Sequence, residues 1–294
     1  MNSRLLTLVA PLLMSALLAA CASGPGATGP GAGPRDSLAR IGQSQTLKLG
    51  YREDAKPFSF KGADGAPAGY SVELCKRVAS SLQAQLKLAR LDVQWVPVTA
   101  TTRMQAVNDG SVDLECGSTS RTLGRERQVD FSNPIWVEGS SFVSLASSSI
   151  GRAVDLNAKR VAVIPGTTTE QVLKGLSSRD IVPALVPVKT SSDGIAAVRD
   201  GRADAFATDS LILVGEVTGG APGATLRLSN DYLSMESYSL MMRRDPDMRL
   251  AVNRALAETY RSGEIVRVFR QSFPAGTAPS PLVEAVYLLN ALPE

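Results

Sequence analysis

Histidine is absent from this chain of 294 residues. Its absence excludes a His-based catalytic triad, histidine metal ligands and the usual general base near neutral pH. Aromatic residues are scarce, at 5%, although 44% of the residues are hydrophobic, which is enough for a buried core in one or two domains. Neither sign of charge dominates, because 31 Lys and Arg are matched by 28 Asp and Glu, so the balance does not indicate a nucleic-acid partner. We therefore favour binding over catalysis and expect no cofactor and no metal ion.

The N-terminal segment resembles an export signal. Arg4 is followed by the uncharged run Leu5–Ala20, which contains a proline and is short for a membrane span. The run ends in LAAC at Cys21, which resembles the bacterial lipobox, whose cysteine is acylated; the alternative is an ordinary signal peptide with a chance cysteine. We predict a lipoprotein signal peptide over residues 1–20 and a Gly/Pro/Ala-rich tether over residues 21–45. Attachment to the membrane would be through the lipid only.

Two cysteines remain once Cys21 is assigned to the lipid. An exported chain with Cys75 and Cys116 permits one disulfide. The alternative is that both are small buried apolar side chains.

Apparent strands and helices alternate along the rest of the chain. This alternation predicts an α/β fold with largely parallel sheets. The expected strands are 47–52, 93–98, 112–117, 160–164, 185–189 and 203–208. The expected helices are 70–88, 103–108, a segment opened by 165–170, one ending at Gly201, and 251–273. Extended runs are expected over 130–145 and 238–243.

One short pattern occurs twice. AVNDGSVD begins at Ala106 and AVRDGRAD begins at Ala197, and both match a helix end, a glycine cap and a strand start. The repeat arises either because one local helix–turn–strand pattern occurs twice or because the chain contains two similar lobes. In the second case Ser118 and Asp209 occupy equivalent places beyond their strands, where open α/β sheets bind ligands.

Four arginines are candidates for holding an anion, although each alone is typical of a solvated surface charge: Arg52, Arg103, Arg121 and Arg125. Arg125 follows the sequence ECGSTS, whose hydroxyls and backbone N–H groups suit a carboxylate. The segment Pro165–Glu170 opens a helix whose N-terminus favours an anion. Asp209 would take an ammonium group. Together these groups fit a ligand with two acidic groups and one amine, in a cavity whose positive charge exceeds its negative charge.

The chain resembles family 3 of the bacterial extracellular solute-binding proteins, the polar amino-acid receptors of ABC importers, and most of all their glutamate/aspartate-binding branch. The matching strings, over about 46–273, are GYRED–PFSF, GYSVELC, VPVTATTRM, VDLECGSTSRTLGRERQVDFS, PGTTTE and GRADAFATDS. The resemblance implies a two-lobed periplasmic-binding-protein fold of type II, with two crossover strands and a ligand cleft. Lobe 1 would comprise residues 46–140 and 241–294, and lobe 2 residues 141–240.

The resemblance implies that Arg125 binds the α-carboxylate of the ligand. Ser120 would assist from the same lobe, and Thr168 with its neighbour Thr167 would assist from across the cleft.

For the rest of the ligand, the resemblance implies that Asp209 and the Ser118 carbonyl bind the α-ammonium group. Arg52 and Arg103 would meet the side-chain carboxylate, which separates acidic from neutral ligands.

Two positions depart from the branch. Ala100 replaces a usual serine, and Ser191 replaces a histidine that helps to bind the distal carboxylate. Leu240 replaces a cysteine found in some relatives, so any disulfide here would join Cys75 to Cys116.

The resemblance implies a monomeric receptor in the periplasm or cell envelope that delivers glutamate or aspartate to a membrane permease. We expect a hinge near Val137–Leu145 and Ser237–Arg243. The alternative is an enzyme on the same fold, such as a cyclohexadienyl-dehydratase-like lyase, with Glu115, Glu170 and Glu236 as candidate acids.

Overall fold

The computed structural model describes residues 36–219 and 225–294. The chain divides into two units, Met1–Gly33 and Pro34–Glu294, and the description below concerns the second. The predicted signal peptide and the lipidation of Cys21 therefore lie outside the described residues. Among the described residues, no helix combines the length and apolar character needed to cross a bilayer.

The first sheet contributes Leu47 and Leu49, both fully buried, to an apolar core. Its order is β5 (Asp92–Val98), β1 (Thr46–Arg52), β6 (Leu114–Glu115), β14 (Met241–Met242) and β7 (Asp130–Phe131). A three-stranded sheet of β2 (Asp54–Ala55), β3 (Ser59–Lys61) and β4 (Pro67–Ala68) follows β1. The helices of this part are α1 (Ser37–Ser44), α2 (Tyr70–Gln85), α3 (Arg103–Asn108), α4 (Leu123–Glu126), α8 (Pro246–Arg261), α9 (Glu264–Ser272) and α10 (Pro281–Asn290).

The second sheet has apolar clusters on both of its faces. Its order is β10 (Ala184–Pro187), β9 (Arg160–Val163), β11 (Ala205–Asp209), β8 (Trp136–Leu145) and β12 (Leu226–Leu228), and β13 (Ser234–Tyr238) also pairs with β8. The helical segments are η1 (Ala153–Leu156), α5 (Thr168–Gly175), η2 (Leu176–Arg179), α6 (Ser191–Arg199) and α7 (Ser210–Gly219). Along β11, Phe206 packs into one cluster while Ala205 and Ala207 pack into the other, as the two-residue period of a strand requires.

The sheets are mixed rather than largely parallel. β1 is parallel to β5 and β6, and β9 is parallel to β10 and β11. However, β14 is antiparallel to both of its neighbours, and β8 is antiparallel to all of its own. The expectation of largely parallel sheets was wrong for these strands because the connecting segments enter the sheets in the reverse direction.

The repeated sequence pattern forms the same local structure twice. α3 ends just before Gly110 and α6 just before Gly201, and both glycines have positive φ, at 78° and 69°. A residue without a Cβ takes this left-handed conformation at little cost and so ends a helix. The helix, glycine and strand order predicted for both copies is confirmed.

An aspartate three residues after each of these glycines ties the start of the following strand to the neighbouring strand. Asp113 accepts a hydrogen bond from the backbone N–H of Lys48 at 2.9 Å, and Asp204 accepts one from the backbone N–H of Arg160 at 2.8 Å. The two sheets therefore use the same contact to align a central strand, which agrees with either alternative for the repeated pattern.

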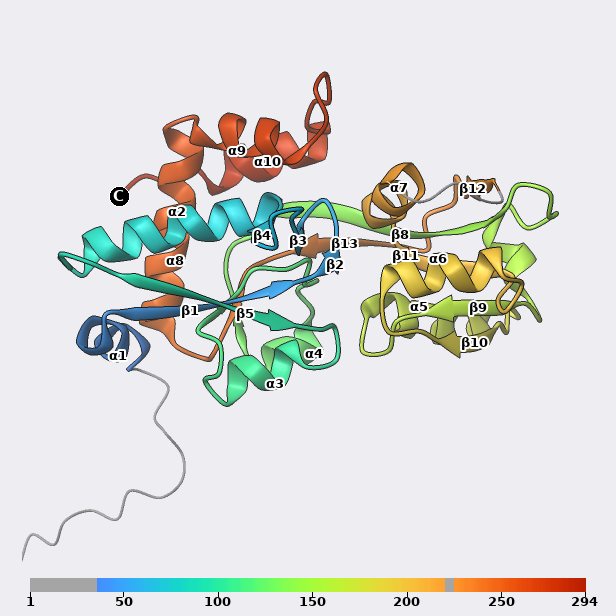
Figure 1. Ribbon diagram of the computed structural model, residues 1–294, viewed down its shortest axis with the longest axis horizontal. Helices are drawn as coiled ribbons and strands as arrows, with labels where there is room; N and C mark the ends of the chain where they lie inside the picture. Colours follow the sequence, from blue (N-terminus) through green and yellow to red (C-terminus); the bar gives the residue numbers. More distant parts are fainter. Residues whose placement is uncertain (1–35, 220–224) are drawn as a thin grey trace, which may run out of the picture. The chain divides into compact units, whose positions relative to one another are not determined.

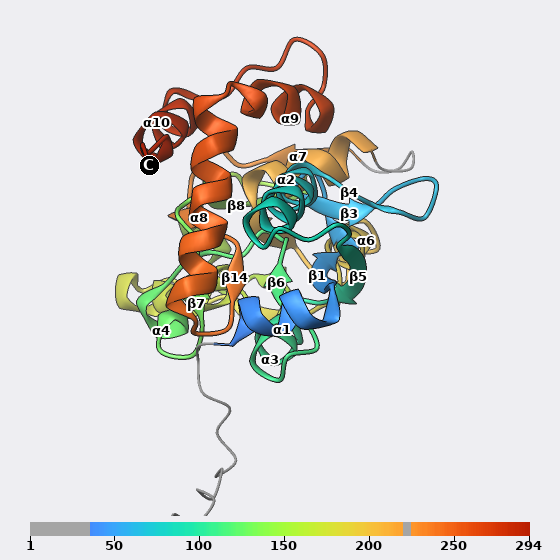
Figure 2. The same cartoon turned by 90° about the vertical axis from the view of Figure 1, so that its left-hand side faces the viewer.

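Two antiparallel strands connect the two sheets (Figure 1). β8 begins at Trp136 in the apolar core of the first sheet and continues to Phe142 in a core of the second. β13 returns beside it and leads into β14 of the first sheet. Figure 2 shows α8 running along this first part of the fold, with α9 and α10 near its end. The division into lobes at residues 140 and 240, and hinge motion at these strands, remain predictions.

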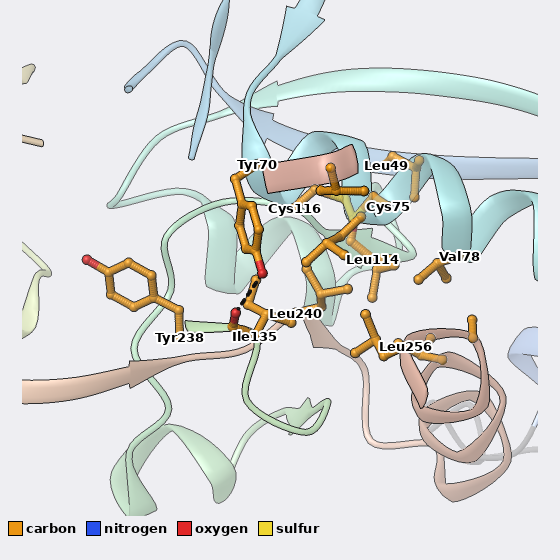
Figure 3. Packing of buried hydrophobic residues seen from close by; sticks show 14 of the residues in the cluster. Leu49, Tyr70, Cys75, Val78, Leu114, Cys116, Ile135, Tyr238, Leu240 and Leu256 are labelled. Atoms are coloured by element: carbon orange, nitrogen blue, oxygen red, sulfur yellow. Dashed lines mark hydrogen bonds between the residues drawn. A yellow bond between two sulfur atoms is a disulfide. The ribbon is translucent and has the colours of Figure 1, made fainter. Parts of the chain in front are cut away.

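The first core joins α2 to the first sheet and to the connecting strands (Figure 3). Tyr70, fully buried at the start of α2, donates a hydrogen bond to the backbone carbonyl of Ile135 at 3.0 Å. A disulfide joins Cys75 of α2 to Cys116, which directly follows β6. Both cysteines are also fully buried.

Three expected segments differ from the structure. α1 lies within the predicted tether, because Ile41 is fully buried in the first core and anchors that helix. The single helical run expected over 251–273 is broken after Arg261, because Gly263 adopts a positive φ of 76°. The strand expected over 112–117 is also shorter, at Leu114–Glu115.

Removing the disulfide should destabilise the protein. For Cys75→Ala with Cys116→Ala, we expect the free energy of unfolding to fall by about 2–4 kcal/mol, because the cross-link closes a loop of 41 residues in the unfolded chain. Urea unfolding followed by circular dichroism measures this change. Reduction of the native protein should reproduce it, whereas alkylation of both thiols in the unreduced native protein would contradict the linkage.

Candidate functional site

Strand ends from both sheets surround one small cavity. Arg52 is the last residue of β1, Ser118 follows β6, and Asp209 is the last residue of β11. The cavity is lined by Arg52, Arg103, Ser118, Ser120, Ile164, Thr167, Thr168, Ser191, Thr208, Asp209 and Ile212. All the predicted ligand-binding residues except Arg125 are therefore in its wall. The volume open to the centre of a water molecule is only about 20 Å³, so an amino acid could enter only if the walls moved apart.

Arg52 is buried and has its own counterion. Its Nε donates to Oδ1 of Asp54 at 2.8 Å, and its Nη2 lies 2.7 Å from the same oxygen. Asp54 follows two residues later, in β2, so the turn after β1 places the carboxylate beside the guanidinium group. Arg52 thus lies in the cavity wall as predicted, but it is not an unpaired positive charge.

Arg103 is a buried cation with incomplete hydrogen bonding. It begins α3, its exposed fraction is 3%, and its Nη1 donates to Oγ1 of Thr119 at 2.7 Å. Thr119 in turn donates to Oε2 of Glu115 at 2.7 Å. The buried Nε has no hydrogen-bond partner among residues 36–219 and 225–294.

Burial also changes the protonation of Arg103. Loss of hydration lowers the pKa of its guanidinium to about 9, and the neighbouring charge of Glu115 opposes this effect. The group is still positive at neutral pH. An anion placed in the cavity would complete its hydrogen bonds and stabilise its charge.

Hydroxyl groups from the two sides of the cavity meet directly. Ser120 Oγ lies 3.2 Å from Thr168 Oγ1, at the start of α5. Arg125 also bridges the two sides, since it donates to the Ser120 carbonyl at 2.7 Å and to the Gly166 carbonyl at 3.0 Å. Burial lowers the pKa of Arg125, while nearby Glu236 opposes the shift.

The hydroxyl of Thr167 is used within its own helix. It accepts a hydrogen bond from the backbone N–H of Glu170 at 3.2 Å and donates to the Ile164 carbonyl at 2.7 Å. Thr167 therefore caps α5, as the sequence predicts. A contact between this hydroxyl and a ligand carboxylate would compete with the cap.

Asp209 supplies a buried carboxyl group at the end of β11. Burial raises its pKa to about 7, and the neighbouring charge of Glu236 adds to the rise, while Arg103 and Arg52 oppose it. The carboxyl group is therefore partly protonated near neutral pH. A ligand ammonium group beside it would favour its ionised form.

The sequence interpretation missed the negative charge around the cavity. Glu115 and Glu236 were considered only as catalytic acids, and Thr119 only as one of the hydroxyls of ECGSTS that suit a carboxylate. With Asp54 and Asp209, these two glutamates place four carboxyl groups near the three arginines of the site. The expected excess of positive charge is not observed. The position of Glu115 in the sequence ECGSTS could have indicated a carboxylate at the cavity. No local sequence pattern indicated that Glu236 lies there.

Glu170, one of the three candidate acids of the enzyme alternative, is engaged at the start of α5. Glu170 accepts the backbone N–H of Gly166 at 2.8 Å and pairs with Lys174 at 2.7 Å, so it stabilises the start of α5. Within the described part of the chain, no group of three or more His, Cys, Asp or Glu residues could hold a metal ion.

Sequence comparison identifies the family. Residues 47–275 match the model of the bacterial extracellular solute-binding proteins, family 3, and the chain belongs to this family. It is 32% identical over 278 residues to the L-glutamate/L-aspartate-binding protein of Pseudomonas aeruginosa, covering 93% of this chain and 91% of that protein. It is 28% identical over 248 residues to the glutamate/aspartate import solute-binding protein of Salmonella typhimurium, covering 84% and 82%.

Structural comparison agrees with the sequence. An ancestral arginine-binding protein bound to arginine superposes with a TM-score of 0.70 at 27% identity, covering 78% of this chain and 99% of that one. The fold is the periplasmic-binding-protein fold of type II, as predicted. A cyclohexadienyl dehydratase of Pseudomonas aeruginosa matches over only 59% of this chain, at 28% identity. The two binding proteins above match over more of the chain, at 93% and 84%, and both are named as solute-binding or amino-acid-binding proteins.

The buried carboxyl groups should make stability depend on pH. Burial raises the pKa of Asp209 and of Glu138 to about 7, above the ordinary values of 3.8 and 4.5. The folded chain then holds more protons than the unfolded chain between about pH 4 and 7, so this contribution to stability is lost as the pH rises through 7. Urea unfolding at pH 5 and pH 8 measures this loss of the free energy of unfolding. The loss should be smaller by roughly 1–3 kcal/mol for Asp209→Asn than for the native protein.

The control for this experiment is Asp200→Asn, which removes an exposed carboxylate. Its pH dependence should match that of the native protein. If Asp209→Asn also matched the native protein, the assignment of a raised pKa to Asp209 would be refuted.

Proposed function

We propose that this protein is the substrate-binding component of an ABC importer and captures glutamate or aspartate in the cavity between its two sheets. The names of the relatives support an acidic amino acid as ligand. The observation that carries the proposal is Arg103, a buried cation at a cavity wall with an unsatisfied Nε. Such a group is stabilised strongly by an anion and poorly by a neutral group.

The side-chain carboxylate of the ligand would bind at Arg103. Arg52 adds positive charge on the same wall, although Asp54 already neutralises part of it. Arg103 is therefore the main determinant of selectivity for acidic over neutral amino acids in this proposal.

The α-carboxylate would bind between Ser120 and Thr168, with Arg125 close by. The α-ammonium group would bind Asp209 and the Ser118 carbonyl. Ionisation of Asp209 on binding would supply the charge that the ammonium group requires. Three or four charge-assisted hydrogen bonds, after ordering costs, correspond to roughly micromolar affinity.

Capture would involve closure of the two parts of the fold about β8 and β13. The contacts of Ser120 with Thr168 and of Arg125 with Gly166 join the two sides of the cavity and would be broken on opening. A ligand that contacts both sides would stabilise the closed form, which a permease could then recognise.

The remaining parts of the proposal concern location and partners. Family membership agrees with a place outside the cytoplasm. We propose that residues 1–20 direct export to the periplasm or cell envelope and that Cys21 carries the lipid that holds the protein at a membrane. We also propose that the protein acts as a monomer and meets the permease subunits of its importer.

Calorimetric titration with glutamate, aspartate, glutamine and asparagine tests the ligand class. We expect micromolar binding of at least one acidic amino acid and binding at least about 100-fold weaker for the corresponding amide, because an amide adds no negative charge to a guanidinium group that Glu115 compensates only in part. Equal affinity for acid and amide would contradict the proposed class of ligand.

A substitution at Arg103 tests the proposed determinant itself. Arg103→Gln should weaken glutamate binding about 100-fold and glutamine binding by less than tenfold, since it removes the charge that only the acid requires. Arg127→Gln, which removes an exposed arginine, is the matched control and should leave both affinities unchanged. Equal losses for the two ligands would contradict a role in selectivity.

A further inference from the structure

Glu236 occupies the place that the proposed function gives to the ligand's α-carboxylate. Its Oε2 accepts hydrogen bonds from the hydroxyls of Ser120 and Thr168, the latter at 2.5 Å. Its Oε1 accepts a hydrogen bond from Ser234 at 2.6 Å. Arg125, the cation proposed for the same carboxylate, is close enough for the Glu236 charge to affect it.

The backbone places Glu236 there. Glu236 lies in β13, and the end of this strand pairs with the segment that carries Ser120. Arg121 donates its backbone N–H to the Ser237 carbonyl at 2.9 Å, and Ser239 donates to the Thr119 carbonyl at 3.1 Å. These main-chain hydrogen bonds, both made by residues that follow Glu236, hold the end of β13 beside the segment that carries Ser120.

A ligand and Glu236 cannot use this place together. Ser120 and Thr168 each have a single hydroxyl proton to donate, so neither can serve two carboxylates at once. Two carboxylates at hydrogen-bond distance from the same hydroxyls would also repel each other strongly.

We propose that Glu236 is an internal competitor for the α-carboxylate site, which lowers the affinity for the ligand and holds the two sides of the cavity together until a ligand displaces it. The proposal rests on the proposed function. Glu236 joins Ser120 on one side to Thr168 on the other, which is the same pair of contacts that a bound α-carboxylate would make. Each ligand molecule must therefore displace the Glu236 carboxylate from the hydroxyls of Ser120 and Thr168. The apparent affinity for the ligand is lower the larger the fraction of protein in which Glu236 occupies these hydroxyls.

The experiment compares the native protein with Glu236→Gln, which keeps the shape and removes the charge, and with Glu236→Ala. Glu216→Gln is the matched control, because Glu216 is a partly buried carboxylate of the second sheet's helices that accepts a hydrogen bond from Ser192 instead. Calorimetry gives the Kd for glutamate, and small-angle X-ray scattering gives the radius of gyration with and without saturating glutamate.

We expect both Glu236 variants to bind glutamate about tenfold more tightly than the native protein. Without ligand, they should have a larger radius of gyration than the native protein, and with ligand the same radius. The control should match the native protein in both measurements. An unchanged or weaker affinity, or an unchanged ligand-free radius, would overturn the proposal.

The two measurements separate this proposal from the proposed function. If the native protein binds glutamate and the variants bind it no more tightly, the function stands and the competition is refuted. If no acidic amino acid binds any of these proteins, the proposed function fails, and the ligand-free radius alone decides whether Glu236 holds the two sides together.

Discussion

The buried guanidinium group of Arg103 is the constraint on which the rest of the site depends. Taking a cation out of water is costly unless hydrogen bonds and a counter-charge replace the lost hydration. Here Thr119 and Glu115 supply part of that replacement, and the Nε group has no partner within the described chain. The cavity is therefore arranged around a charge that the protein itself stabilises only in part, and this is the physical basis of the proposal that it selects an anion.

The walls of the cavity come from one structural unit used twice. In each sheet a helix ends at a glycine and leads into a central strand that an aspartate aligns with its neighbour. Ser118 follows β6 and Asp209 is the last residue of β11, and both line one cavity. The connecting strands β8 and β13 then bring a third element, Glu236, to the same point.

Local patterns in the sequence predicted the parts of this arrangement that depend on neighbouring residues. The repeated AVxDG pattern predicted both helix ends, and the threonines after Gly166 predicted the start of α5. The pairing of Arg52 with Asp54 could not be predicted, because two residues of a strand and turn meet only if the chain bends between them. The role of Glu236 depends on contacts with Ser120 and Thr168, both far away in the sequence, so no local pattern revealed it.

The most direct test of the account is a crystal structure of the protein with bound glutamate. The account predicts the side-chain carboxylate within hydrogen-bond distance of Arg103 and the α-carboxylate between Ser120 and Thr168, with Glu236 displaced from both hydroxyls. A complex in which Arg103 meets no acidic group of the ligand, or in which Glu236 keeps both hydroxyls, would contradict it.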